Sequence, residues 1–376
     1  MRIATSIRRI AYLLALTALL APSKAAARVP DGFVGAMLDG RAEALGPAGL
    51  ARELDVMRAS GVQTVRVVWS WRDAQPYVSW DAVPEVERAR FRDVGGLPLS
   101  VGRLDALVEL AARRGLRVFP VAVYTPVWIV RRLGVLGSPP RAVGPYAAFL
   151  RALVGRYGSR GSFWREHPRL PRRPVRWWQL WNEPHLRDYW AAPSWWSGYA
   201  ALARAAARAV HRADPRARVV LAGLTSDRLP VWDRLDQLLA EGVGPEVDMV
   251  AAHVFTSSPR NVVRALRRVR ATLRDYGLGR VPIALTEWSW ASSRRGPAWA
   301  TTPRGQARRV GATLRLLAAA RRRLGIRSTV YYTWASREGG RAWSSWAGLR
   351  RVLPGGRVVA KPALAAFRRA ARAVRR

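Results

Sequence analysis

Two glutamates follow short apolar runs in this sequence, and each is a candidate for chemistry at a carboxylate. Glu183 follows Trp-Trp-Gln-Leu-Trp-Asn and precedes Pro184, whereas Glu287 follows Ile-Ala-Leu-Thr and precedes Trp288. A carboxylate at the end of a buried strand is unfavourable unless it is paired, hydrogen-bonded or used in a reaction. The alternative for Glu183 is a solvated turn, because Asn and Pro favour loops. The elements around the two glutamates decide between these interpretations.

Short apolar runs alternate along the chain with Ala-, Leu- and Arg-rich segments of helical period. The runs that predict strands are Phe33–Met37, Thr64–Val68, Arg117–Val123, Val175–Leu180, Val219–Ala222, Val247–His253, Ile283–Thr286 and Thr329–Thr333. The segments that predict helices are Leu50–Ser60, Gly102–Arg114, Tyr146–Tyr157, Trp195–Ala213, Val231–Glu241, Asn261–Tyr276, Pro303–Leu324 and Pro362–Val374. Eight strands that are each followed by a helix predict an α/β protein with a single (β/α)8 barrel, the TIM barrel.

In such a barrel the active site forms at the C-terminal ends of the strands. The side chains expected there are Trp69, Trp71, Tyr124, Trp128, Trp181, Asn182, Glu183, His253, Glu287, Trp288, Trp290 and Trp334. Arg66 lies inside the second strand. Carboxylates, a histidine, an arginine and many tryptophans on one rim predict a site that binds a sugar.

The ordered set of motifs resembles the clan A glycoside hydrolases, which are retaining β-glycosidases on (β/α)8 barrels and include families 5 and 39. The motifs that carry the resemblance are Trp181-Asn182-Glu183-Pro184, Thr286-Glu287-Trp288, Arg66 in VRVVWSW, His253, Trp334 in YYTWAS, and Lys361-Pro362-Ala363. They extend from the second strand to the last helix, so the resemblance covers nearly the whole chain after the first 27 residues.

The resemblance implies a role for each polar residue. Glu183 would be the acid/base and Glu287 the nucleophile, although 104 residues separate them, and retaining enzymes hold such carboxyl groups ~5–5.5 Å apart. Asn182 would hydrogen-bond the sugar 2-hydroxyl. Arg66 would keep Glu287 ionised, because a nearby cation favours the carboxylate.

Aromatic residues and the histidine are the further candidates for substrate binding. The resemblance implies that Trp334 stacks on the sugar and that His253 belongs to the site, with core packing as the alternative for each. Tyr124 and Trp288 are also counted among the candidates for substrate binding, although Trp288 fits the cleft wall and the core equally well. The tryptophans that fit the cleft wall and the core equally well are Trp69, Trp71, Trp128 and Trp290.

One motif departs from the family 5 pattern. Members of that family usually carry His-x-Tyr after the sixth strand, and the tyrosine hydroxyl bonds the nucleophile, whereas this chain has His253-Val254-Phe255. Either Tyr124 or Tyr332 supplies the hydroxyl that bonds Glu287, or Glu287 has one hydrogen bond fewer than its counterpart in that family. The resemblance is therefore to the clan rather than to one family.

No metal or other cofactor is predicted. His167, His185 and His211 do not show the spacing of metal ligands.

The first 27 residues predict a secretory signal peptide. A basic start with Arg2, Arg8 and Arg9 precedes the apolar run Ile10–Ala21, and Ala25-Ala26-Ala27 provides a cleavage site after Ala27. An uncleaved N-terminal anchor is the alternative. Residues 28–376 would then form one secreted glycoside hydrolase domain, and the absence of cysteine is compatible with an oxidising compartment.

The formal net charge of +39 raises the question of a polyanionic partner. Only Lys24 and Lys361 are lysines, and the arginines are scattered along helices, which is typical of a GC-rich genome and argues against a nucleic-acid-binding motif. A field this basic still attracts acidic cell-wall polymers. Three functions are therefore compatible with the sequence: a retaining β-glycosidase or endoglycanase that acts on an oligo- or polysaccharide, a non-catalytic carbohydrate-binding barrel, and a basic protein that binds surface polysaccharides. No motif specifies the sugar, exo or endo action, or the oligomeric state.

Overall fold

The computed structural model describes residues 28–38, 45–226, 228–293, 296–297 and 299–376. The predicted leader, residues 1–27, lies outside this range. Within the described ranges, no helix is both long enough and apolar enough to cross a bilayer.

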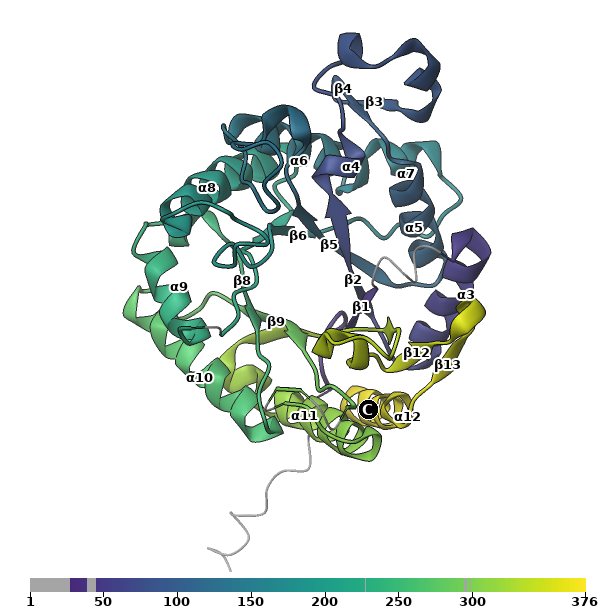
Figure 1. The fold of residues 1–376 in the computed structure, drawn as a ribbon, viewed down its shortest axis with the longest axis vertical. Helices are drawn as coiled ribbons and strands as arrows, with labels where there is room; N and C mark the ends of the chain where they lie inside the picture. Colours follow the sequence, from purple (N-terminus) through teal and green to yellow (C-terminus); the bar gives the residue numbers. More distant parts are fainter. Residues whose placement is uncertain (1–27, 39–44, 227, 294–295, 298) are drawn as a thin grey trace, which may run out of the picture.

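Eight parallel strands form the central sheet in the order β7-β6-β5-β2-β1-β10-β9-β8. The strands are β1 (Val34–Leu38), β2 (Thr64–Ser70), β5 (Arg117–Val123), β6 (Trp177–Leu180), β7 (Arg218–Val220), β8 (Val250–His253), β9 (Ile283–Trp288) and β10 (Ile326–Tyr331). Isolated parallel bridges from Val220 to Met249 and from Leu224 to Ala252 connect the two ends of the sheet. The sheet is therefore a nearly closed barrel, which confirms the predicted (β/α)8 fold (Figure 1).

Helices surround the barrel on the outside (Figure 1). The long ones are α3 (Gly46–Ala59), α5 (Gly102–Arg113), α6 (Gly144–Tyr157), α8 (Trp195–Ala213), α9 (Val231–Leu239), α10 (Pro259–Asp275), α11 (Pro303–Leu324) and α12 (Pro362–Arg375). The short ones are α4 (Trp71–Ala74) and α7 (Ser162–Glu166). Each long helix follows one barrel strand, as the sequence predicts, and helix and strand bounds differ from the predicted ones by a few residues at most.

The strands are apolar along almost their whole length because both of their faces are covered. All five residues of β1 and all six of β9 are buried, as expected for a parallel sheet enclosed by helices. One apolar cluster occupies the barrel interior and consists of Met37, Phe119, Trp177, Val220, Met249, Ala251, Ala284 and Val330. A larger cluster packs the outer face of the strands against the helices.

Two small sheets outside the barrel were not predicted. A hairpin of β3 (Arg92–Val94) and β4 (Leu97–Leu99) lies between β2 and α5. A three-stranded sheet of β11 (Ala335–Ser336), β12 (Arg350–Val352) and β13 (Val358–Ala360) lies between β10 and α12. These strands have two or three residues each, which is too short for the alternation of apolar and polar residues to be recognised.

Candidate active site

A fully buried arginine connects the polar side chains inside the barrel. Arg66 of β2 is 0% exposed, and its Nη1 donates to Oε1 of Glu287 at 2.7 Å. Its Nη2 donates to Oδ1 of Asn182 at 3.0 Å, and its Nε donates to Oε1 of Gln179 at 2.9 Å. A buried cation without a counter-ion is strongly unfavourable, so the Glu287 carboxylate supplies the compensating charge.

The bond to Arg66 also sets the orientation of the Asn182 amide. Because Oδ1 of Asn182 accepts from the guanidinium, the amide oxygen faces Arg66 and the NH2 group remains as the donor. Asn182 is 6% exposed, and it directly precedes Glu183 in the chain. The amide therefore presents donors, which is the chemistry needed to bind a sugar hydroxyl.

His253, the last residue of β8, lies between the two glutamates. Its Nδ1 is 2.8 Å from Oε1 of Glu183, and its Nε2 is 3.6 Å from Oε1 of Glu287. Burial lowers the pKa of His253 to about 4, with the Arg66 charge acting in the same direction and Glu287 opposing it. The ring is thus neutral at pH 7, and Nδ1 either donates a hydrogen bond to an ionised Glu183 or accepts one from a protonated Glu183.

The two glutamates are close enough to act on one bond. An oxygen of Glu183, a nitrogen of His253 and an oxygen of Glu287 all lie within 4.8 Å of one another. Glu183 is 9% exposed and Glu287 is 7% exposed. The structure therefore brings Arg66, Asn182, Glu183, His253 and Glu287 together, although they come from four different strands or the residues that follow them.

The backbone that carries Glu183 is in an uncommon conformation. Tyr124, Trp181 and Glu183 have φ angles of +73°, +70° and +39°, in a region that residues other than glycine seldom adopt. Hydrogen bonds fix the turn, because the Trp181 amide donates to the Ala122 carbonyl at 3.0 Å and the Glu183 amide donates to the Gly223 carbonyl at 3.1 Å. Such conformations persist where the surrounding structure enforces them, and they are concentrated at functional sites.

Gly223 is a positioning residue that the sequence did not indicate. Its carbonyl holds the Glu183 amide, and it forms a parallel bridge with Asn182. A Cβ atom at this position would lie 1.9 Å from Nε2 of His253. Only glycine therefore allows the imidazole to occupy the space between the two carboxylates. Gln179, whose side chain accepts from Arg66, is a second such residue.

Two of the predicted substrate-binding tryptophans pack in the core instead. Trp334 is 0% exposed, and its indole nitrogen donates to Oε2 of Glu53 on α3 at 2.7 Å. Trp288 is also 0% exposed, with its ring 5.1 Å from that of Tyr331 and 6.0 Å from that of Trp290. Neither ring has a face open to a sugar, which corrects both predictions. Three of the tryptophans that fitted the cleft wall and the core equally well are also buried, namely Trp69, Trp71 and Trp290.

A different aromatic cluster is partly exposed near the glutamates. It consists of Phe255, Trp299, Tyr332 and Trp343, which follow β8, β9 and β10. The Trp343 ring is 4.7 Å from Phe255, 5.7 Å from Trp299 and 5.8 Å from Tyr332. The amide of Val254 donates to the carbonyl of Glu287 at 2.9 Å, so Phe255 is next to the end of β9. This cluster is the better candidate for a sugar-stacking surface.

Tyr124 is half-buried and stacks on Tyr189, with 6.0 Å between the ring centres and 19° between the planes. Burial raises the pKa of Tyr124, while a hydrogen bond with Tyr189 opposes that shift, and both Glu183 and Glu287 contribute to raising it. Tyr124 is therefore near both glutamates. That Tyr124 or Tyr332 replaces the family tyrosine stays a prediction.

Glu183, His253 and Glu287 are also close enough to coordinate a cation. Two contacts oppose this use, because Oε1 of Glu287 is already bound by the Arg66 guanidinium and Oε1 of Glu183 is bound by His253. A divalent ion would have to displace these contacts beside a buried positive charge. The predicted absence of a metal stays a prediction with a direct test.

Prolonged dialysis against EDTA should leave turnover of an aryl glycoside unchanged within about twofold, because the resemblance assigns proton transfer and nucleophilic attack to the carboxylates and neither step needs a metal ion. The measurement is kcat/KM before and after dialysis, with Zn²⁺, Mn²⁺ and Ca²⁺ added back separately. Loss on dialysis with recovery on adding one ion would make this trio a metal site.

Comparison with known proteins gives a match in structure only. No family model matches the chain, and no curated protein matches it in sequence. A monomeric β-xylosidase from Caulobacter crescentus is 20% identical with a TM-score of 0.59, and the match covers 91% of this chain and 68% of that one.

Two further solved structures are similar to the same extent. A family 39 glycoside hydrolase from Xanthomonas axonopodis pv. citri is 20% identical with a TM-score of 0.60, covering 91% of this chain and 66% of that one. A family 51 α-L-arabinofuranosidase from Bifidobacterium longum is 15% identical with a TM-score of 0.62, covering 92% and 73%. The chain thus spans about two thirds of the length of these enzymes and has the barrel fold found in glycoside hydrolases of families 39 and 51.

Replacing two tryptophans should separate packing from sugar binding. Trp334→Ala should lower the free energy of unfolding by about 3–5 kcal/mol, because it removes a fully buried ring and the hydrogen bond to Glu53. Trp343→Ala, at a partly buried ring, should cost clearly less stability than Trp334→Ala and lower kcat/KM roughly 10- to 100-fold through poorer positioning. Urea denaturation and aryl glycoside kinetics on the same preparations test both. The reverse pattern would restore Trp334 as the sugar platform.

The buried histidine should make stability depend on pH. The pKa of His253 falls from its usual value of 6.5 to about 4 in the native state. Between these two pH values the unfolded chain therefore binds a proton at His253 that the folded chain does not. Stability should therefore fall as pH is lowered through this window, by up to about 1.4 kcal/mol per pH unit from this group.

His253→Asn keeps a donor near the position of Nδ1 and removes this titration. Its free energy of unfolding, measured by urea denaturation at constant ionic strength, should fall less steeply between pH 6.5 and 4 than that of the wild type. Parallel curves for the two proteins would mean that His253 titrates normally.

Proposed function

We propose that this protein is a retaining glycosidase that hydrolyses O-glycosidic bonds by double displacement. The observation that carries the proposal is the approach of a Glu183 oxygen and a Glu287 oxygen to within 4.8 Å. Retaining enzymes hold the two carboxyl groups ~5–5.5 Å apart, whereas inverting enzymes need ~6.5–9.5 Å to admit a water molecule. The fold shared with solved glycoside hydrolases supports the same conclusion.

In the first step Glu287 attacks the anomeric carbon. A carboxylate oxygen of Glu287 forms a bond to that carbon while the bond to the leaving oxygen breaks, and Glu183 transfers its proton to the departing oxygen. The salt bridge from Arg66 fixes one Glu287 oxygen at 2.7 Å and leaves the second oxygen as the attacking atom. Positioning of this kind is a large part of the rate enhancement available to an enzyme.

In the second step a water molecule displaces the Glu287 carboxylate from the anomeric carbon. Glu183, now a carboxylate, takes a proton from the water, whose oxygen attacks the anomeric carbon and releases Glu287. Neutral His253 supports both protonation states of Glu183, because its Nδ1 accepts from the acid and donates to the carboxylate after a change of tautomer. The amide of Asn182 donates to the sugar hydroxyl next to the reacting carbon.

The proposal extends to location and substrate class. The leader at residues 1–27 supports an exported enzyme. The β-configuration of the substrate follows from the resemblance to clan A, and an oligo- or polysaccharide is the expected substrate, cleaved as a β-glycosidase or an endoglycanase would cleave it. The basic surface supports association with acidic cell-wall polymers.

Variants of the two glutamates should fail in different ways. Glu287→Gln should abolish turnover of every substrate, because no covalent intermediate forms. Glu183→Ala should lower kcat/KM by roughly 10²–10⁴-fold for natural leaving groups and by less for activated phenols, which leave without a proton. Added azide should restore turnover of the activated substrates by entering the space vacated at Glu183 and attacking the glycosyl-enzyme.

Kinetics with aryl β-glycosides and NMR of the product anomer test this assignment. Glu85→Gln, at an exposed carboxylate, is the control and should match the wild type. Inverted products, or equal loss in both variants without azide rescue, would refute the double displacement. A folded wild type that binds sugars but turns over no glycoside would instead make the barrel a carbohydrate-binding module.

A further inference from the structure

Charge is distributed very unevenly among the outer helices. α10 carries six arginines and one aspartate, α11 carries seven arginines and no acidic residue, and α12 carries four arginines and no acidic residue. In contrast, α3 and α5 each carry two arginines and two acidic residues, and α9 carries one arginine and two aspartates. Two further helices, α6 and α8, also lack acidic residues, but they carry only two and three arginines. The arginines are thus densest on α10, α11 and α12, whereas a genomic preference alone would act evenly along the chain.

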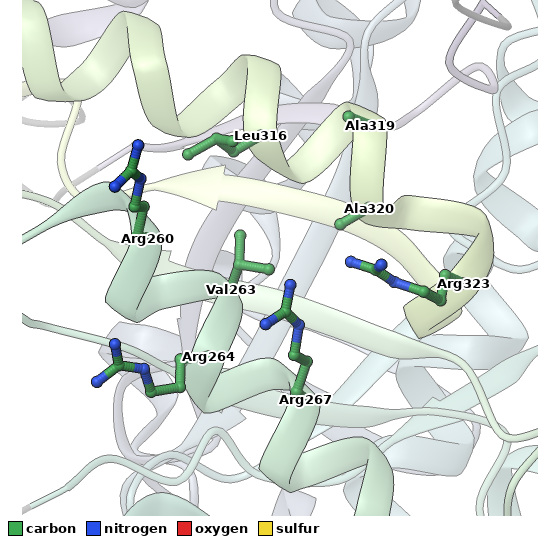
Figure 2. A pocket seen from close by; sticks show the side chains of 8 residues that line it. All are labelled: Arg260, Val263, Arg264, Arg267, Leu316, Ala319, Ala320 and Arg323. Carbon is green, nitrogen blue, oxygen red and sulfur yellow. The ribbon is translucent and has the colours of Figure 1, made fainter. Parts of the chain in front are cut away.

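A groove between α10 and α11 lies within this basic side (Figures 1 and 2). It has a volume of about 600 Å³ and is lined by Arg260, Arg264 and Arg267 of α10 and by Arg323 of α11. The three arginines of α10 follow one another at intervals of one helical turn and span about 10 Å along the groove. All four side chains are exposed.

None of the four arginines has an acidic partner in the described part of the chain, and no acidic residue lines the groove there. A second arginine-rich hollow, at the N-terminal ends of the barrel strands, does contain acidic partners. Asp248 in that hollow binds Arg218 at 2.8 Å, and Arg117 in the same hollow binds Asp31 at 2.7 Å. The α10–α11 groove therefore keeps its positive charge uncompensated.

The floor of the groove is apolar. It is formed by Val263 of α10 and by Leu316, Ala319 and Ala320 of α11, and Figure 2 shows Val263 and Ala320 between the arginines of α10 and Arg323 of α11. Short alanine side chains leave room for a ligand between the helices, while Leu316 is 37% exposed. The groove thus combines an apolar base with guanidinium groups at its edges.

We propose that this groove binds a single chain of a polysaccharide whose sugars carry carboxylate groups. The guanidinium groups would pair with the carboxylates, which they match in geometry, and the C–H faces of the sugar rings would lie on the apolar floor. The groove is on the outer surface of the barrel, whereas Glu183 and Glu287 are inside it, so binding here does not depend on the proposed hydrolase activity.

The lining favours a glycan over other polyanions. Sites for single-stranded nucleic acid normally stack the bases on aromatic side chains, and no aromatic residue in the described part of the chain lines this groove. A surface that binds membranes projects several large apolar or aromatic side chains into the lipid, whereas Leu316 is the one large apolar side chain exposed among the described lining residues.

Removing the four groove charges tests the proposal directly. The variant Arg260→Gln/Arg264→Gln/Arg267→Gln/Arg323→Gln should bind polygalacturonate roughly tenfold or more weakly than the wild type, because four ion pairs are lost. The matched control, Arg151→Gln/Arg160→Gln/Arg169→Gln/Arg212→Gln, removes the same charge at four exposed positions elsewhere. It should bind within about twofold of the wild type. Affinity is measured by calorimetry at 0.1 M NaCl, with circular dichroism to verify folding.

The ligand is varied in the same assay. Methyl-esterified pectin has the same backbone with most carboxylates neutralised, and it should bind weakly to all three proteins. Equal loss of affinity in both variants would show a general effect of net charge and overturn the groove as a site. Tighter, groove-dependent binding of single-stranded DNA or phosphatidylglycerol vesicles than of polygalacturonate would overturn the choice of an anionic polysaccharide.

Discussion

The arrangement of the site depends on one buried positive charge. Arg66 has no solvent exposure, so each of its donors must find an acceptor within the barrel, and one acceptor must be an anion. Glu287 of β9 provides the anion, while Gln179 of β6 and Asn182 after β6 provide neutral oxygens. Because these partners come from different strands, satisfying Arg66 fixes how β2, β6 and β9 are placed relative to one another at their C-terminal ends. The proposed nucleophile, Glu287, is therefore positioned by the same contact that makes the buried arginine tolerable.

That charge also shapes the other half of the site. Burial disfavours a charged imidazole, and the Arg66 charge acts in the same direction, so the pKa of His253 falls and the ring is neutral. A neutral imidazole is able to donate or accept at Nδ1, which faces Glu183. Glu183 must exchange a proton in each half of the proposed reaction, whereas Glu287 keeps an ion pair with Arg66. The unequal environments of two carboxylates a few ångströms apart thus correspond to unequal chemical roles.

The sequence predicted the barrel, and it placed together the polar residues that the structure brings together, because both follow from simple regularities. Buried parallel strands are continuous apolar runs, and functional groups lie where those runs end, which identified Arg66, Asn182, Glu183, His253 and Glu287 as a group. The tryptophans were harder, since a large aromatic ring suits a core as well as a sugar cleft. Alternation within β9 separates the cases, because Glu287 faces the interior and its neighbour Trp288 packs against Tyr331 outside it. Gly223 gave no signal, because its importance is the absence of a Cβ atom near a residue 30 positions away.

The charge of this protein shows why composition must be considered together with the fold. In the sequence, arginines scattered at helical spacing indicate only a biased genome, and a net charge of +39 indicates only a general attraction to polyanions. The barrel places α10, α11 and α12 side by side (Figure 1), so arginines from separate segments form one surface on which Asp275 is the single acidic residue of the three helices. Exposed like charges repel one another, and such a surface is less favourable than the balanced surfaces of α3 and α5. A ligand that carries negative charges along its length relieves this repulsion, and the groove between α10 and α11 provides the shape to hold one.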